Sequence, residues 1–133
     1  VIIKAAAVGD YKFKKFEKNK VKKNDSEIYF EMEKTNDILA RLGQEKKPNQ
    51  ILIGFSAETE NTINNAMKKI KNKNLDLIVA NDISFPDSGF GKDNNFTYMV
   101  SKNKSVEDLG LISKPNLSIK IGDYIKRIRM ELS

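Results

Sequence analysis

The sequence predicts an α/β domain with a mostly parallel sheet that is flanked by helices. Three short apolar segments, at residues 1–8, 50–55 and 75–80, are typical of strands that are covered on both faces. Between the last two strands, apolar residues recur at helical spacing over residues 63–70. Because buried strands that alternate with helices usually pair in parallel, this order of segments favours the α/β class.

The first half of the chain holds two further expected elements. Gly9-Asp10 ends the first strand, and the alternating polarity of residues 27–33 predicts a strand with one face in water. Thr35-Asn36-Asp37 is typical of a helix start, with a side-chain cap and an acid in the first turn. Gly43 then predicts the end of that helix.

The second half ends in a polar loop at residues 81–94, an edge strand at residues 96–100 and a closing helix. The closing helix is expected from an apolar face, made by Ile121, Ile125, Ile128 and Leu132. In open sheets of this class, ligands lie at the carboxyl ends of the strands. Those ends are polar or contain glycine at residues 9–10, 55–58 and 81–82, so we expect the site at that edge.

Length and charge set the domain organisation. The 133 residues predict a single domain over residues 1–133. Because the chain opens directly within an expected buried strand, we also expect that this domain lacks its N-terminal elements. The net charge of +6 resides in residues 12–23, which hold seven lysines and one glutamate, while the rest of the chain is neutral. Residues 12–24 are therefore expected to form a mobile lysine-rich flap.

The composition excludes several kinds of chemistry. With no cysteine and no histidine, the chain has no disulfide, thiol nucleophile, Ser-His-Asp triad or imidazole metal site. No apolar run reaches the roughly 18 residues that a membrane span needs. We therefore expect a cytoplasmic protein whose chemistry rests on carboxylates, lysines, hydroxyls, amides and hard metal ions.

Two of the polar motifs have a structural as well as a functional interpretation. Asp10 follows small residues and is placed to accept from a ribose or to hold Mg²⁺, but Gly9-Asp10 is also an ordinary turn pair. The lysines of residues 12–23 suit the neutralisation of a polyphosphate, although a solvated charge run is the commoner outcome. A nucleic-acid patch is a second alternative, weakened by the neutral remainder of the chain and by the absence of arginine from the run.

Each of the other candidate residues also has both a functional and a structural interpretation. The helix start at residues 36–39 can bind a phosphate through its backbone amides, but Asp37 would repel an anion and ordinary capping is favoured. Phe55 either flanks a base at the mouth of the crevice or belongs to the core. Lys69 and Lys73 share a helix face that points at a ligand or at solvent. From the residues alone, the chain is an α/β domain that binds an anionic ligand.

Taken in order, six segments resemble the phosphopantothenoylcysteine synthetase family. They span the chain from Ala5 to the final helix and read AAAVGDY, KVKK, TNDIL, GFSAETE, KNLDLIVANDIS and GFGKDNN. Members of this family are the carboxy-terminal, CoaB half of bifunctional CoaBC proteins, or separate enzymes of coenzyme A biosynthesis. The resemblance implies a Rossmann-like sheet.

The resemblance also implies a ligase that joins 4′-phosphopantothenate to L-cysteine. In the family, the carboxylate attacks the α-phosphorus of CTP and gives an acyl-cytidylate and pyrophosphate, and the cysteine amine then displaces CMP. The implied ion is Mg²⁺ or Mn²⁺, without assigned metal ligands, and no FMN is expected on this chain. The implied partners are a second copy in a homodimer, and either a missing N-terminal segment or a flavin-dependent decarboxylase.

By position, the resemblance assigns the residues of the nucleotide site. Lys20, the first lysine of KVKK, is implied to be catalytic because it would hold the charged phosphates and the acyl group. The implied nucleotide-binding residues are Ala5, Ala6, Asp10, Lys20, Asn36, Asp37, Ile38, Leu39, Phe55, Lys69 and Lys73.

The sequence departs from the family pattern at a few positions. Gly9 and Ser56 stand where alanine is usual, and Asn36 stands where proline is common. The family also carries an N-terminal glycine-rich stretch and an asparagine that handles the acyl-cytidylate, and neither has a counterpart in this sequence. We therefore expect a chain that binds CTP weakly without completing the ligation.

Overall fold

The computed structural model describes residues 1–15, 19–20, 27, 29–89 and 91–131. Contacts between residues divide the chain into two compact units. The first unit comprises Val1–Ala5 and Leu39–Ser133, and the second comprises Ala6–Ile38. Each unit is described by itself.

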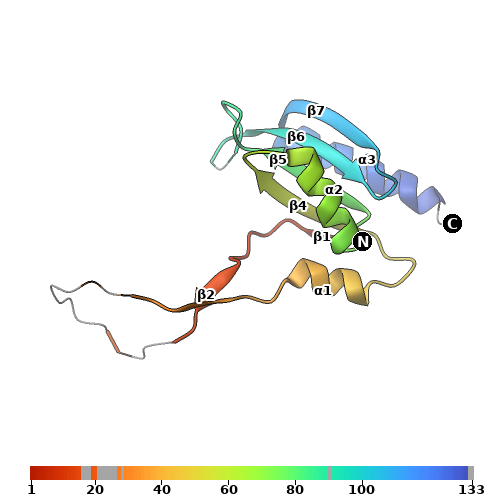
Figure 1. Cartoon of the computed structure of the whole chain (residues 1–133). Coiled ribbons are helices and arrows are strands. Elements are labelled where there is room, and N and C mark those ends of the chain that lie inside the picture. The colour runs from red at the N-terminus through yellow and green to blue at the C-terminus, as the bar shows by residue number, and fades with distance from the viewer. Residues whose placement is uncertain (16–18, 21–26, 28, 90, 132–133) are drawn as a thin grey trace. The chain divides into compact units, whose positions relative to one another are not determined.

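The first unit is built on a five-stranded sheet with the order β1-β4-β5-β6-β7 (Figure 1). Its strands are β1 (Ile2–Lys4), β4 (Leu52–Glu58), β5 (Leu77–Asp82), β6 (Asn94–Ser101) and β7 (Val106–Ser113). β1, β4 and β5 pair in parallel, β6 is antiparallel to both of its neighbours, and β7 therefore runs in the direction of β5. The predicted α/β fold with a mostly parallel sheet is confirmed.

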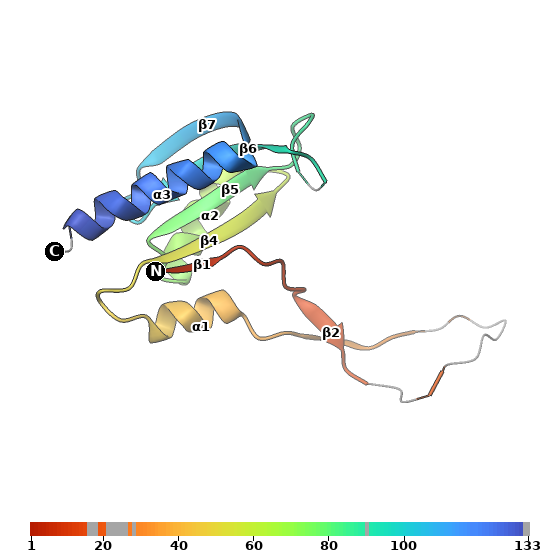
Figure 2. The ribbon, with the colours of Figure 1, turned by 180° about the vertical axis from the view of Figure 1, so that it is seen from behind.

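Three helices flank this sheet. Buried apolar residues form two hydrophobic cores, one on each face of the sheet. The helices are α1 (Ile38–Glu45), α2 (Thr62–Asn72) and α3 (Lys114–Glu131). On one face, Leu39 of α1 and Ala66 of α2 pack with Leu52. On the other face, Leu117 of α3 packs with Ile53, and Figure 2 shows α3 along this side of the sheet.

The first strand is shorter and more exposed than the sequence predicts. The apolar run of residues 1–8 predicts a buried strand, but β1 spans only Ile2–Lys4 and Ile3 is 47% exposed. The reason is that β1 pairs with β4 alone and lies at an edge of the sheet. The prediction of a strand covered on both faces is wrong here.

The edge strand at the other side of the sheet also differs from the prediction. Residues 96–100 are expected at an edge, yet β6 pairs with both β5 and β7. The true edge strand is β7, whose sequence VEDLGLIS contains two acids and a glycine, and therefore lacks a clear strand pattern. A register shift lies between Thr97 and Tyr98, and opposite it Gly110 adopts a φ of 59°.

Gly43 allows a close approach between two elements and does not end its helix. α1 continues to Glu45, two residues beyond the expected end. A Cβ atom added to Gly43 would lie 1.9 Å from the carbonyl oxygen of Lys73, and the Asn74 side chain donates to the Gly43 carbonyl at 2.9 Å. The predicted helices over residues 63–70 and 121–128 are found in α2 and α3, while Leu132 lies outside the described residues.

The second unit is built on the antiparallel pair of β2 (Tyr11–Phe13) and β3 (Met32–Lys34). β3 overlaps the strand expected over residues 27–33, whereas β2 is not predicted by the sequence. Phe13 and Phe30 meet edge to face, with ring centroids 5.2 Å apart. Most of the expected flap over residues 12–24 lies outside the described residues, so its mobility stays a prediction.

No helix within the described ranges has the length and apolar character needed to cross a membrane.

Candidate functional site

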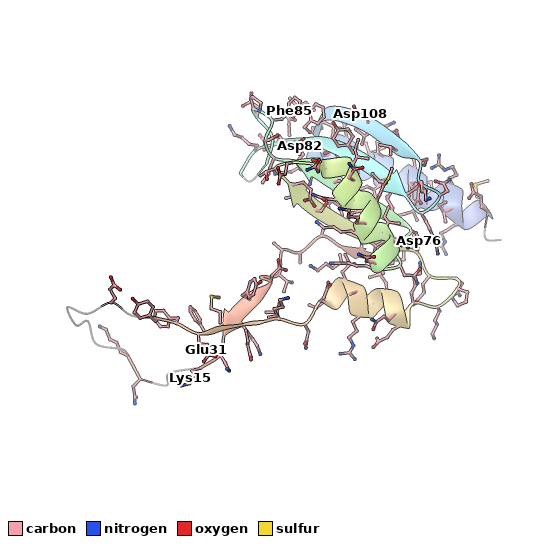
Figure 3. All side chains as sticks on the ribbon, in the orientation of Figure 1. Lys15, Glu31, Asp76, Asp82, Phe85 and Asp108 are labelled. Carbon is pink, nitrogen blue, oxygen red and sulfur yellow. The ribbon has the colours of Figure 1, made fainter. Side chains whose placement is uncertain are left out.

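The carboxyl ends of β4 and β5 lie side by side in the first unit and are polar. Glu58 and Asp82 are register partners at the last position of the two strands. Figure 3 labels Asp82 at the carboxyl ends of the strands, which we call the polar edge, and Asp76 at the opposite end, where β5 begins. The expected gathering of polar strand ends is therefore present for these two strands.

Glu58 organises the residues that follow β4. Its carboxylate accepts a hydrogen bond from Asn65 at 3.1 Å and forms an ion pair with Lys69. The Glu58 side chain is only 12% exposed, so the ion pair is partly shielded from water. Lys69, a candidate for the nucleotide pocket, is therefore held by a carboxylate of its own unit.

Asp82 shapes the loop that follows β5. Its carboxylate accepts hydrogen bonds from the Ser84 backbone at 3.0 Å and from the Ser84 hydroxyl at 2.6 Å. The Thr62 hydroxyl at the start of α2 also donates to it, at 3.4 Å. These contacts tie the start of α2 to the end of β5 and fix the polar edge.

A row of aromatic rings continues from this loop onto β6. Phe85 stacks on Phe96 with ring centroids 3.9 Å apart, and Phe96 meets Tyr98 at 5.6 Å. Burial raises the pKa of the Tyr98 phenol above its usual value, and the carboxylates of Asp108 and Asp82 add to the rise. Phe85 is 45% exposed, so this row presents a ring to solvent beside the polar edge.

In the second unit, the two ends of the hairpin meet at Thr35. The Thr35 backbone amide donates to the carbonyl of Asp10 at 2.9 Å, and its hydroxyl donates to the carbonyl of Gly9 at 2.6 Å. Three candidate residues, Asp10, Asn36 and Asp37, are exposed and lie at or next to this junction. Asp10 and Thr35 are far apart in the sequence, and the pairing of β2 with β3 brings their backbones together.

Part of the lysine run is neutralised within the same unit. Lys12 pairs with Glu33 at 3.1 Å, and Lys14 pairs with Glu31 at 2.5 Å. Lys15 and Lys20 are exposed, and neither forms an ion pair with a carboxylate of the described residues. Lys20 is thus one of the cations that remain available to an anionic ligand.

Three candidates in the first unit have structural surroundings. Leu39 is 7% exposed in the core, so only its backbone can face a ligand. Phe55 is half-buried and packs against the core on the α3 side of the sheet. Lys73 follows the carboxyl end of α2, where its carbonyl lies against Gly43.

The candidate residues divide between the two units. The first unit holds Ala5, Leu39, Phe55, Lys69 and Lys73. Of these, Ala5 is exposed. The second unit holds the remaining candidates, which are Ala6, Asp10, Lys20, Asn36, Asp37 and Ile38. Glu58 lies in the polar strand end at residues 55–58 that the sequence predicts at the site, but it was not named as a site residue, and Asn65 was not predicted.

Parallel strands with polar carboxyl ends, covered by helices on both faces, define an α/β domain of the Rossmann-like class. Residues 1–128 match the family described as the DNA/pantothenate metabolism flavoprotein C-terminal domain. The chain belongs to this family, which confirms the resemblance to the CoaB portion of CoaBC-type proteins.

Similar proteins include the coenzyme A biosynthesis bifunctional protein CoaBC of Bacillus subtilis (strain 168). It is 44% identical over 121 residues, which cover 91% of this chain and 30% of that protein. A cysteine/cysteine sulfinic acid decarboxylase of an unknown prokaryotic organism is 37% identical over 128 residues, covering 96% of this chain and 35% of that protein. The chain spans about a third of the length of these curated relatives.

Among solved structures, the fold is similar to the crystal structure of the C-terminal domain of the coenzyme A biosynthesis bifunctional protein CoaBC. The TM-score is 0.69 and the sequence identity is 37%. The match covers 98% of this chain and 53% of that chain.

Proposed function

We propose that this chain is the CTP-binding portion of a phosphopantothenate–cysteine ligase that acts in coenzyme A biosynthesis. The observation that supports this most strongly is the family match over residues 1–128, a range that contains every candidate residue. The relatives named as coenzyme A biosynthesis proteins support the same role. The polar edge of the sheet supports a ligand at the position that α/β domains generally use.

The proposed reaction has two steps. The carboxylate oxygen of 4′-phosphopantothenate attacks the α-phosphorus of CTP, and the bond to the β-phosphate breaks to release pyrophosphate. The amine of L-cysteine then attacks the acyl carbon, loses a proton and displaces CMP. Because negative charge gathers on phosphate oxygens in the first step, lysine cations near them lower its barrier.

Within the second unit, the proposed roles follow from exposure and charge. Lys20 supplies a positive charge to the phosphates and the acyl group because no described carboxylate neutralises it. Asp10 accepts from the ribose hydroxyls, and the chain at residues 36–38 offers the start of α1 to a phosphate. The backbone of Ala6 lines the nucleotide.

Within the first unit, Ala5 and Leu39 contribute backbone groups, and Phe55 borders the base. Lys69 acts differently from Lys20, since Glu58 already neutralises it. A phosphate that reaches Lys69 has to share or replace this carboxylate, so Lys69 contributes to the shape of the pocket more than to its charge. The family resemblance also assigns Lys73 to the pocket, although Lys73 follows the carboxyl end of α2 and Asp82 lies at its start.

The metal ion is proposed to arrive with the nucleotide. No group of three or more acidic side chains gathers among them, and Mg²⁺ is commonly bound through substrate phosphates and one or two carboxylates. Mg²⁺ or Mn²⁺ on CTP would supply charge neutralisation. Asp10 is the candidate carboxylate for that complex.

The proposed partners follow from the relatives. A flavin-dependent decarboxylase is proposed as a partner, because relatives of this chain include bifunctional CoaBC proteins and a protein named as a decarboxylase. The homodimer is proposed from the family resemblance alone. FMN would then belong to the decarboxylase and not to this chain. The proposed location is the cytoplasm.

A titration with CTP·Mg²⁺ by calorimetry tests the role of Lys20. Lys20→Gln is expected to weaken binding roughly tenfold, because it removes one charge-assisted contact to phosphate. The matched control is Lys15→Gln, which removes the same charge from an exposed lysine of the same run (Figure 3). We expect the control to change the affinity less than threefold, roughly what screened surface charges give.

Two results would overturn this proposal. One is the absence of measurable heat from the unaltered chain at high protein concentration. The other is an equal loss of affinity in Lys20→Gln and Lys15→Gln, which would mean that the run acts as diffuse charge. A separate assay of pyrophosphate release shows whether the chain turns over by itself.

A further inference from the structure

The first unit contains a pocket of about 810 Å³ at the edge of the sheet opposite its polar carboxyl ends. Its walls come from the segments before β4 and β5, from the turn between β6 and β7, and from the carboxyl half of α3. Figure 3 labels Asp76 at this edge and Asp82 at the other. The volume is within the range of roughly 300–1,000 Å³ that is typical of small-molecule sites.

Asp76 makes the back of this pocket rigid. Its carboxylate pairs with Lys46 at 2.7 Å and accepts the backbone amide of Leu52 at 2.7 Å. Its carbonyl accepts the hydroxyl of Tyr124 at 2.8 Å and the amide of Lys102 at 2.9 Å. A single residue thus joins the start of β4, the turn before β7 and α3, so that the walls hold a fixed shape.

The charge that remains on the walls is positive. The Lys46 side chain is 7% exposed and its charge is cancelled by Asp76. Lys47, Lys102 and Arg127 also line the pocket, and no carboxylate in the described part of the chain forms an ion pair with them. Glu131 is the other acid on the walls, which leaves an excess of cations.

The same pocket has an apolar and aromatic wall. Ile51 is 2% exposed and Tyr124 is 7% exposed, and both border the cavity. The guanidinium carbon of Arg127 lies 5.4 Å from the centroid of the Tyr124 ring, so the two side chains are in cation–π contact on the same wall. Burial raises the pKa of Tyr124 to about 12, so this phenol is neutral at ordinary pH and adds no negative charge.

We propose that this pocket binds a small organic phosphate, with its phosphate between Lys102 and Arg127 and its apolar body against Tyr124. Beyond the Lys46–Asp76 pair, the walls carry three cations and one acid, and this positive excess favours an anion. Arg binds phosphate oxygens in a forked geometry. The apolar wall favours a ligand with a carbon body over a bare ion. The pocket is separate from the polar carboxyl ends of β4 and β5, since it lies at the opposite end of these strands.

Titrations of the chain with phenyl phosphate and with inorganic phosphate test this proposal. The readout is the movement of backbone amide signals in NMR spectra, with Asn74, Ser101 and Asn103 as reporters on the walls. Phenyl phosphate is expected to shift these signals and to bind more tightly than inorganic phosphate. The pocket variant Lys102→Gln/Arg127→Gln should weaken phenyl phosphate roughly tenfold or more.

The control variant is Lys104→Gln/Lys126→Gln, which removes two neighbouring charges that do not line the pocket. Its affinity for phenyl phosphate should match that of the unaltered chain. The proposal is overturned if phenyl phosphate shifts no pocket signal, if inorganic phosphate binds as tightly, or if both double variants lose the same affinity. An unchanged pattern of signals elsewhere in the spectrum verifies that the pocket variant is folded.

Discussion

Ser56 in β4 has a buried hydroxyl oxygen for which the described residues provide no hydrogen-bond partner. The register places Ala80 of β5 opposite it. A buried polar atom without a partner costs about 1–3 kcal/mol of folding free energy. The resemblance to the synthetase family already identified this position as one where alanine is usual, and the structure gives a physical reason for that preference.

We expect Ser56→Ala to raise the free energy of unfolding by about 1 kcal/mol, because it removes the unsatisfied oxygen without a change in packing. Urea denaturation of the two proteins provides the measurement. Ser84→Ala is the comparison, since the Ser84 hydroxyl donates to Asp82 at 2.6 Å and its loss should not stabilise the chain. A destabilising effect of Ser56→Ala would show that the hydroxyl has a partner that matters.

Other single residues show how far the sequence alone could reach. The candidate Lys69 could be selected from its place on a helix face, but its ion pair with Glu58 could not, because the two residues come from different elements. For Leu39, the sequence led to a wrong expectation about the side chain. Its place at a helix start suggested a ligand, whereas its side chain is part of the core.

At the scale of elements, the packing of α1 against the end of α2 depends on Gly43. Its Cα lies so close to the Lys73 carbonyl that a methyl group has no room, at 1.9 Å from the oxygen. The Asn74 side chain adds a hydrogen bond to the Gly43 carbonyl at 2.9 Å. The two helices therefore approach each other through backbone atoms.

Gly43→Ala is expected to lower the free energy of unfolding by about 2 kcal/mol, because overpacking outweighs the better helix propensity of alanine. Gly122→Ala in α3 is the matched control, since no atom lies within 4 Å of its added Cβ. That change should stabilise the chain by about 0.5–1 kcal/mol. Thermal unfolding of both variants measures the difference, and equal effects at the two glycines would contradict this packing.

The strands show which elements the sequence predicts well. β4 and β5 are buried on both faces, so their apolar runs stand out, and both were located within two residues at their starts. β1 and β7 lie at the edges, where one side of the strand has no neighbour and burial is incomplete. The apolar run at β1 therefore predicted a longer, buried strand, and the sequence of β7 gave only a weak strand pattern.

At the scale of the whole chain, the lysines of residues 12–23 differ in whether a carboxylate neutralises them. Lys12 and Lys14 have carboxylate partners on the opposite strand, whereas Lys15 and Lys20 have none among the described residues. The local excess of +6 is therefore reduced by Glu31 and Glu33, which the linear sequence separates from it. This pairing weakens the nucleic-acid alternative, because fewer cations are left for a phosphate backbone.

The sequence predicted the candidate site only in part. The sequence identified motifs at the ends of β4 and β5, and the structure places those ends together. It also identified Asp10 and Asn36, and the carbonyl of Asp10 accepts the amide of Thr35, the residue before Asn36. The pocket around Asp76 was not predicted, because its walls come from four separate segments that share no motif.

The central claim is that the chain binds a nucleoside triphosphate and not a nucleic acid. The most direct measurement compares calorimetric titrations of the unaltered chain with CTP·Mg²⁺ and with a random single-stranded oligonucleotide, at about 150 mM salt. We predict saturable binding of one CTP per chain and no measurable binding of the oligonucleotide. Binding of the oligonucleotide in the absence of any response to CTP would contradict the claim.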